Sequence, residues 1–495
     1  MTTTRAPIQP SLSPRRRWAA LGVLVGAVLL LAIDGTVLYL AVPSLTRELA
    51  PSATEILWIG DIYSLALAGL LVTAGNLADR FGRKKVLLLG TAAFGAASVL
   101  AAFSPTAGVL VVARLLLGVA GATIMPSTLS LIRTLFADPR ERTRAIAIWS
   151  AGSGGGIALG PLVGGTLLEH YWWGSVFLIN VPVVVGFLIA GAVLLPESRD
   201  PDPGRFDLLS AALSMVAIVP LVYAVKHAVS EGIDAQVAVA AALGVVAGTL
   251  FVRRQRRAAD PLIDVGLFRN GAFSGAVLAN FVAVFALMGL LFFFSQYLQL
   301  VRGFSPLRAG LAEMPATLAS IAVVAAVGVV VGRLGQGRAV AAGLAVAALG
   351  LALVAVVEES PRYWWLGLTL VPVGLGVGLA LTLTVDSVLS AVPKDKAGSA
   401  SAISETAYEL GAALGIALLG SLVTVVYRAF LPAGAPGEVR ESLASAAATL
   451  DPASGLAQAA RDAFTGAMQV TSLAAAAVTA VAALIAWRTI PSGKD

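Results

Sequence analysis

The feature that most restricts the fold of this chain is a series of apolar segments that recurs from one end to the other. A helix of about 20 residues is long enough to cross the hydrocarbon core of a bilayer. Charged residues, prolines and glycines separate fourteen segments of roughly this length. They lie near residues 18–42, 56–77, 86–104, 108–133, 145–168, 174–195, 207–226, 235–252, 272–301, 310–331, 339–357, 363–390, 398–428 and 465–487.

Composition supports the same interpretation. Hydrophobic residues make up 58% of the 495 positions and charged residues only 13%, whereas soluble domains are about half apolar and a quarter charged. The first apolar segment follows a basic stretch but lacks a convincing small-residue cleavage site, so we expect a retained helix and not a signal peptide. The sequence therefore predicts an all-α polytopic membrane protein with fourteen spans.

The basic residues indicate the orientation of these spans. Most of the 34 Lys and Arg fall in segments on the same side as both termini, including "RRR" at 15–17, "GRKK" at 82–85 and "RRQRR" at 253–257. By the positive-inside rule, both termini are cytoplasmic. This topology also explains the net charge of +6, so we expect no binding of nucleic acid.

Several kinds of chemistry are not indicated. The chain has no cysteine, and its two histidines, His170 and His227, are too far apart in sequence to suggest a zinc site. No phosphate-binding GxxxxGK[ST], GxSxG nucleophile elbow or HExxH motif is present. We therefore expect no enzyme, no metal and no cofactor. Energy for pumping would come from an ion gradient unless a separate subunit supplied it.

A polar loop between the second and third spans has the sequence "GNLADRFGRKKVLL", residues 75–88. Its acidic and basic side chains can pair with groups at neighbouring helix ends and so latch two helical bundles in one arrangement. Obedience to the positive-inside rule alone would explain the basic residues but not the spacing of the glycines and Asp79. The candidate gating residues are Gly75, Asp79, Arg80, Gly82 and Arg83.

The same spacing returns at residues 328–338, "GVVVGRLGQGR", with Gly332 in place of the aspartate. Two related halves suggest a duplicated bundle with a site between its halves. We expect a six-helix bundle over 1–195, two inserted helices over 196–271, and a second six-helix bundle over 272–495. The second bundle includes an outer loop at 429–464, which could contain a short amphipathic helix.

These motifs resemble those of the major facilitator superfamily, and within it the fourteen-helix drug:proton antiporter branch. The loop at 75–85 is similar to the signature loop of the superfamily, and "RLLLGVAGA" at 114–122 to its fourth-helix motif, with Leu117 replacing the usual Gln. "IDGTVLYLAVP" at 33–43 is similar to the first-helix motif of the branch, with Tyr39 where Asn is usual. The resemblance implies a monomeric multi-pass protein of the bacterial inner (cytoplasmic) membrane.

Asp34 interrupts an almost uniformly apolar run, "LLLAIDGTVLYLAVP". A charge at that depth is costly, and ionisable groups inside membranes are functional by default. Arg114 is the one basic residue placed inside a span away from its ends. We expect Asp34 to carry a coupling proton and to contact substrate, and the family motif implies that Arg114 takes part in proton transfer. The alternative is a structural ion pair or hydrogen-bonded acid.

Glu405 and Glu409 lie four residues apart and so share one face of the thirteenth span. Two carboxylates close together in a low dielectric disfavour simultaneous ionisation, so a proton or an organic cation on one affects the other. Tyr408 adds an aromatic surface, and we expect all three residues to bind substrate. Asp61 is expected near the outer end of the second span, hydrated, with a role in cation capture or outer gating.

A glycine-rich segment in the fifth span, "GIALGPLVGG" at 156–165, is similar to the antiporter motif of the family. Proline removes a backbone hydrogen bond and glycines allow close helix contact, which predicts a bend and a tight interface. Small-residue packing is common in membrane proteins, so the direction of transport rests on the resemblance. The motif residues are Gly156, Gly160, Pro161, Gly164 and Gly165.

The function expected from these features is proton-coupled efflux of lipophilic compounds, with cations favoured, by alternating access. Quaternary ammonium compounds, dyes and antibiotics are the substrate classes that the resemblance implies. Two other interpretations remain open. One keeps the fold but exports a single self-made antibiotic or a lipid, and the other is a non-transporting membrane receptor, which the buried carboxylates disfavour.

Overall fold

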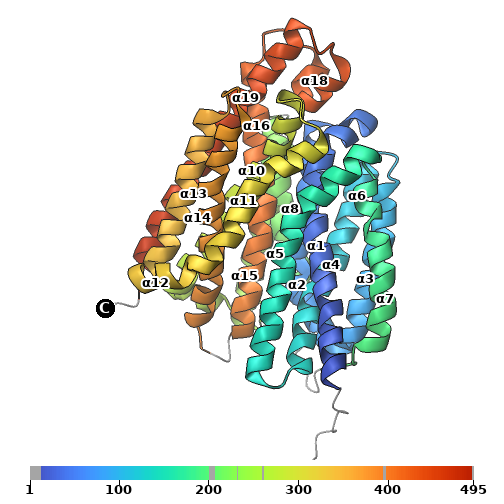
Figure 1. Cartoon of the computed structure of the whole chain (residues 1–495), viewed down its shortest axis with the longest axis vertical. Helices are drawn as coiled ribbons and strands as arrows, with labels where there is room; N and C mark the ends of the chain where they lie inside the picture. Colours follow the sequence, from blue (N-terminus) through green and yellow to red (C-terminus); the bar gives the residue numbers. More distant parts are fainter. Residues whose placement is uncertain (1–12, 200–206, 231, 259–260, 394–396, 493–495) are drawn as a thin grey trace, which may run out of the picture.

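The computed structural model describes residues 13–199, 207–230, 232–258, 261–393 and 397–492. It contains fourteen helical spans that are long and apolar enough to cross a membrane, which confirms the predicted fold class. The helices lie side by side in one bundle (Figure 1). The end at which the first helix begins and the last helix ends is called the terminal face, and the opposite end the loop face.

The helices fall into three groups along the chain. The first set is α1 Pro14–Leu49, α2 Ala53–Phe81, α3 Arg83–Ala102, α4 Ala107–Leu135, α5 Pro139–His170, α6 Ser175–Leu178 and α7 Asn180–Leu194. The middle pair is α8 Leu208–Ser230 and α9 Ala235–Arg257. The second set is α10 Gly271–Gln296, α11 Pro306–Ala322, α12 Val327–Leu334, α13 Gln336–Val357, α14 Tyr363–Ser390, α15 Ala397–Leu414, α16 Gly420–Phe430, α17 Gly437–Glu441, α18 Leu443–Thr449 and α19 Gly455–Thr489.

Short non-α segments join several of these helices. A π-helical turn, η2 Tyr297–Val301, continues α10, and another, η5 Gly415–Leu419, joins α15 to α16. Two 3₁₀ turns, η1 Val265–Arg269 and η3 Val323–Ala326, precede α10 and α12. Several spans are therefore continuous helices with a local change of pitch and not uniform α-helices.

Many helix starts follow capping signals that can be read in the sequence. Ser52 and Glu55 form a capping box at α2, in which each side chain accepts a hydrogen bond from the backbone N–H of the other. Asp138 caps α5, and Pro139 occupies the first helical position, where its missing N–H costs nothing. These signals satisfy the free N–H groups that every helix start presents.

A glycine with positive φ ends the second membrane span of each set, at the end of α2 and of α12. Gly82 has φ 110° and Gly335 has φ 78°, a region that favours glycine. A Cβ on Gly82 would lie 2.8 Å from the Glu197 carboxylate, and one on Gly335 would lie 2.0 Å from the Ser492 carbonyl oxygen. Each glycine thus packs against the segment that follows the last long helix of its own set. The two sets therefore share this local arrangement.

The main contacts between the two sets include the helix pairs α1 with α10, α2 with α15, and α5 with α11. The Tyr39 and Phe292 rings meet edge to face at 5.5 Å, and Gln299 donates to the Leu40 carbonyl at 3.0 Å. Across α5 and α11, a Cβ on Gly310 would lie 2.3 Å from the Pro161 carbonyl oxygen. These contacts lie in the halves of the helices nearer the loop face, so the structure is closed at that face.

The middle pair packs against this closed seam. Val222 of α8 forms a small buried apolar cluster with α2 and with the α15–η5 region. Helix α8 therefore covers the place where α2 of the first set meets the second set. The members of this cluster are Ile62, Leu65, Val222, Ala413 and Ala417.

The final helix differs from its prediction at one end. It begins at Gly455 and not near residue 465, because the Ser454 hydroxyl caps it by accepting from the Ala457 N–H at 3.2 Å. The first turns are polar, so hydropathy alone places the start of the helix too late. The loop-face connection therefore covers 431–454 and contains two short helices, α17 and α18.

Candidate functional site

Asp34 forms an ion pair with Arg114 at the centre of the first set. The Asp34 Oδ2 lies 3.2 Å from the Arg114 Nη1, and the two side chains are 0% and 1% exposed. The other carboxylate oxygen accepts a hydrogen bond from the Asn180 amide at 2.7 Å. Both predicted residues are therefore in direct contact, and burial makes their charges strongly dependent on each other.

Arg114 has further partners on α2. Its Nε donates to the Ile59 carbonyl at 3.1 Å, and its guanidinium lies 4.6 Å from the centre of the Tyr63 ring. A guanidinium needs several acceptors when buried, and these contacts supply them. Proton uptake by Asp34 would remove the ion pair of Arg114, so the protonation state of Asp34 alters the forces between α1, α2 and α4.

Asn180 was not among the predicted site residues. It begins α7, directly after the break at Ile179, and also donates to the Ser98 hydroxyl at 3.1 Å. The signal that could have identified it is a single carboxamide within an apolar run, "VFLINVPVVV". A buried amide in such a run needs a partner, and here that partner is the carboxylate of Asp34.

The acidic pair of α15 faces the same region from the second set. Glu409 is 8% exposed and lies within reach of the Ser64 hydroxyl of α2. Tyr63 lies within electrostatic range of Asp34, Arg114 and Glu409, and Tyr39 is similarly close to Glu409. The two tyrosines therefore connect the Asp34–Arg114 pair of the first set with the carboxyls of the second.

Glu405 and Tyr408 complete the α15 contribution. Glu405, Tyr408 and Glu409 are electrostatic neighbours, and Tyr39 of α1 is close to Tyr408. A cation held here would meet two carboxyl groups and aromatic rings, which attract cations by charge and through the ring face. The arrangement can bind a proton or an organic cation. Among the described residues, no group of three or more His, Asp or Glu side chains could hold a metal ion.

Asp61 lies in a different setting from the one predicted. It is completely buried, and its Oδ2 lies 2.7 Å from the Lys226 ammonium of α8, which in turn lies 3.6 Å from the centre of the Trp58 ring. The expectation of a hydrated carboxylate near an interface is therefore wrong. Hydropathy places the end of this span at residue 226, but α8 continues to Ser230, so Lys226 lies inside the helix.

The loop at 75–88 ties together parts of the first set. The Arg83 Nε lies 2.8 Å from the Asp79 carboxylate, and its Nη1 donates to the Thr134 and Ser198 hydroxyls. Glu197 accepts hydrogen bonds from the first N–H groups of α3, where a carboxylate also complements the helix dipole. These contacts join α2, α3, α4 and the segment after α7.

The other predicted gating residues add little to this network. Gly75 packs against Pro126 of α4, and Arg80 is exposed, with its guanidinium 5.9 Å from the centre of the Phe81 ring. These partners of the loop all belong to the first set, so its gating role remains a prediction.

The glycine-rich motif of α5 packs on the stretch of α1 that carries Asp34. A Cβ on Gly156 would lie 2.7 Å from the Leu29 carbonyl oxygen, and one on Gly160 would lie 1.8 Å from the Thr36 hydroxyl. Gly164 lies against Val37 of the same helix. These three glycines allow α5 to pack closely against the stretch of α1 that carries Asp34.

The end of the same motif contacts the second set. A Cβ on Gly165 would lie 2.7 Å from the Cα of Leu307, and the Pro161 carbonyl faces Gly310, both on α11. A side chain at either glycine would collide with backbone atoms, which cannot move aside as a flexible side chain can. One short motif therefore supports both the Asp34 region and the closed seam.

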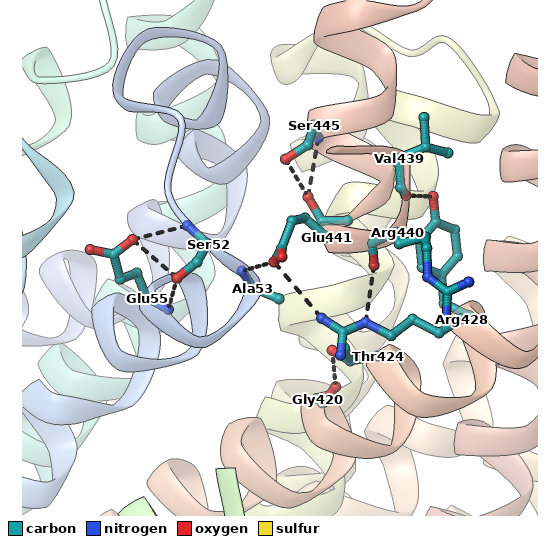
Figure 2. A network of polar contacts seen from close by, with 12 residues as sticks. Ser52, Ala53, Glu55, Gly420, Thr424, Arg428, Val439, Arg440, Glu441 and Ser445 are labelled. Atoms are coloured by element: carbon teal, nitrogen blue, oxygen red, sulfur yellow. Dashed lines mark hydrogen bonds and ion pairs between the residues drawn. The ribbon is translucent and has the colours of Figure 1, made fainter. Parts of the chain in front are cut away.

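A polar network at the loop face links the start of α2 with α16 and α17 (Figure 2). Glu441 of α17 accepts a hydrogen bond from the Ala53 N–H at 3.2 Å and lies 3.8 Å from the Arg428 guanidinium of α16. Arg428 also donates to the Arg440 carbonyl at 3.1 Å. A carboxylate at a helix N-terminus is favourable, so the loop-face connection of the second set binds the start of α2.

The fold and this site define a membrane transporter of small molecules and not an enzyme. The sequence model of the Major Facilitator Superfamily matches residues 24–416. The chain belongs to that superfamily. It is 46% identical over 484 residues to the multidrug efflux pump LfrA of Mycolicibacterium smegmatis, covering 96% of each chain. It is 38% identical to the methyl viologen resistance protein SmvA of Salmonella typhimurium, covering 85% of each.

Solved structures support the same fold. A bacterial homologue of the human lysosomal transporter Spinster, in an inward-facing and occupied conformation, matches with a TM-score of 0.70 at 16% sequence identity. The match covers 97% of this chain and 98% of that one. At this identity the likeness concerns the fold alone, and it extends over both helix sets.

Proposed function

We propose that this protein is a proton-coupled multidrug efflux antiporter that exports lipophilic cations by alternating access. The observation that carries the proposal is the buried Asp34–Arg114 pair, which lies within electrostatic range of Tyr63 together with Glu409 of the second set. A proton on Asp34 and a cation near Glu409 thus act on the same group of side chains. The 46% identity to a protein named as a multidrug efflux pump supports efflux of more than one compound.

The cycle follows from the charges of the site. Protonation of Asp34 neutralises the partner of Arg114, whereas an organic cation is attracted to the carboxyls of Glu405 and Glu409 beside Tyr408. Because these groups interact across the two sets, occupation by proton and by cation disfavour each other. Each charge that crosses the membrane contributes about 2.3 kcal/mol per 100 mV, to which the pH gradient adds.

The orientation that the basic residues predict gives each face a side of the membrane. With both termini cytoplasmic, the closed loop face is external, so this structure is closed toward the outside. The two bundles over 1–195 and 272–495 would rock about the seam, with the middle pair as an insertion, in a bacterial inner membrane. We expect the monomer to be the transporting unit, since both halves of the site lie in one chain.

Transport into proteoliposomes tests the proposal. Proteoliposomes that contain the purified protein should accumulate an ethidium-like or quaternary ammonium cation against its concentration gradient when a pH gradient is imposed. This accumulation should stop when the pH gradient is collapsed. Asp34→Asn should abolish uphill transport because the amide cannot exchange a proton, whereas Glu169→Gln, at an exposed carboxylate of α5, should retain it. Uphill transport at the wild-type rate by correctly inserted Asp34→Asn would contradict the proposal.

The same assay separates broad from narrow specificity. A multidrug pump should transport several unrelated lipophilic cations with comparable efficiency. An exporter dedicated to one antibiotic or lipid would transport a single member of the panel and leave the quaternary ammonium compounds unmoved.

A further inference from the structure

Glu313 of α11 is a buried carboxyl group that has no charged partner among the described residues. Its side chain is 3% exposed, and its Oε1 is buried without a hydrogen-bond partner. The sequence places it near the start of a span, where a carboxylate could stay hydrated. The structure instead seals it inside the protein. Asp34 and Asp61, the buried aspartates of the first set, each have a cation within 3.2 Å.

The position of Glu313 relates it to the closed seam. Gly310, which faces the Pro161 carbonyl of α5, lies one helical turn before it on the same face of α11. Tyr39 of α1 lies within electrostatic range of Glu313. Closure of α11 against α5 and α1 therefore covers this carboxyl, and separation of these helices at the loop face would expose it to water.

The ionisable groups around Glu313 do not include a compensating charge. From α14, Tyr363 lies within electrostatic range and donates its hydroxyl hydrogen bond to the Ala312 carbonyl. Among the described residues, no Lys, Arg or His lies within ion-pair distance of Glu313. The charged groups at the start of α11 have other partners: the Arg308 guanidinium lies 4.0 Å from the centre of the Phe304 ring, and Glu169 accepts from the Leu307 N–H at 3.4 Å.

The π turn η2, which also contacts α11, begins with Tyr297 and is followed directly by Arg302. These two residues are engaged with each other and with the Glu358 carbonyl. Within the described part of the chain, no positive charge is therefore directed at Glu313 from the elements packed against it. Burying an unpaired carboxylate is more costly than burying the neutral acid.

We propose that Glu313 is a proton-gating residue, which must take up a proton from the loop-face solution before the loop face can close. This inference rests on the proposed function. One proton moves from water to the carboxylate oxygen while the seam is open, and it returns to the same side when the seam opens again. Glu313 thus makes closure depend on pH at the loop face without itself carrying a proton across the membrane.

The test measures closure directly as a function of pH. The chain has no native cysteine, so Tyr171→Cys and Phe430→Cys, at exposed positions of the first and second sets near the loop face, allow specific spin labelling. The distance distribution between the labels gives the ratio of closed to open molecules at each pH. By linkage, the slope of the logarithm of this ratio against pH counts the protons taken up on closure.

In the wild type, the closed fraction should increase as pH falls. Glu313→Gln and Glu313→Met both remove the titrating group, and each should lower the slope by about one proton and keep the loop face closed to higher pH. Glu313→Asp should keep the slope, as should Asp462→Asn, at an exposed position of α19 whose carboxylate accepts from Gln458 of the same helix. A wild-type slope in a folded Gln or Met variant would overturn the inference.

The result of the closure titration can be separated from the result of the transport assay that tests the proposed function. Glu313→Gln should still transport cations uphill when a pH gradient is imposed, because Asp34 is intact. Absence of uphill transport by the wild type would contradict the antiporter proposal, whatever the closure titration gives. Uphill transport by the wild type together with an unchanged slope in Glu313→Gln would contradict only the role of Glu313.

Discussion

Lys226 and Asp61 form a 2.7 Å ion pair in which both side chains are completely buried. The pair joins the middle helix α8 to α2, beside the seam between the two helix sets. A buried ion pair is weak evidence for stability, because desolvation offsets the attraction. Loss of one partner is strongly destabilising, because the remaining charge is then buried without a partner.

We therefore predict that Lys226→Met destabilises the protein by about 3–5 kcal/mol, whereas the double variant Lys226→Met with Asp61→Asn recovers most of the loss. Arg254→Met is the matched control, because it breaks the 2.9 Å pair between α9 and Asp207 at a partly exposed guanidinium, which is worth about 0–1 kcal/mol. Unfolding in detergent measures all three. If the double variant is no more stable than Lys226→Met, the loss of stability does not come from the unpaired charge of Asp61.

The close approach of α5 and α11 should be necessary for closure. Gly310→Leu places a side chain where a Cβ already lies 2.3 Å from the Pro161 carbonyl oxygen, so the loop face should shift toward its open form. Gly155→Leu is the control on α5, because a Cβ there meets nothing within 4 Å. Distances between spin labels across the loop face measure the shift. Equal distance distributions for the two variants would refute the prediction that closure needs this close approach.

Glu405 should distinguish cations from neutral compounds. A partly desolvated charge-assisted contact is worth on the order of 1.5–3 kcal/mol, or about ten- to a hundredfold in affinity. Glu405→Gln should therefore weaken binding of quaternary ammonium compounds strongly and of neutral lipophiles much less. Calorimetric titration of both ligand classes measures the difference. Equal losses in folded protein would mean that Glu405 is structural or acts only in coupling.

Glu358 is the residue directly after α13, and its buried carboxyl leads us to predict that the stability of the folded protein depends on pH. Burial raises the pKa of its carboxyl to about 8, although the Ser472 hydroxyl and Arg302 partly oppose the effect. The folded state then binds a proton that the unfolded state has lost, so its stability falls as pH rises from the ordinary glutamate range toward about 8. Glu358→Gln should remove this decline.

The exposed neighbour Glu359 provides the control, since its carboxylate only accepts from Gln469 at the surface. Thermal unfolding of Glu358→Gln, Glu359→Gln and the wild type at about pH 5 and pH 8 measures the contribution of each carboxyl. Parallel pH profiles for Glu358→Gln and the wild type would contradict the assignment.

Much of the architecture could be predicted from the sequence, because each span carries its own apolar run and its own caps. Asp34 and Arg114 were identifiable for the same reason: a charge in an apolar run stands out. Their contact with each other, 80 residues apart in sequence, depends on how α1 packs against α4, which no local pattern encodes.

The failures have a common cause. Lys226 and Glu313 lie near the ends of their apolar runs, where hydropathy suggests water, but neighbouring helices cover both positions. Whether a polar residue near a helix end is hydrated depends on tertiary packing. Similarly, the polar first turns of α19 form helix because Ser454 caps them, and not because they are apolar. The sequence identifies which residues are unusual, and packing decides their partners.

The central claim, competition between a proton and a cation at the site containing Asp34, can be measured without a membrane. Purified protein in weakly buffered detergent solution near neutral pH should release protons when a saturating lipophilic cation is added, and a neutral lipophile should release fewer. Asp34→Asn should bind the cation but release fewer protons, whereas Glu169→Gln should behave as the wild type does. Cation binding by the wild type without proton release would contradict the account.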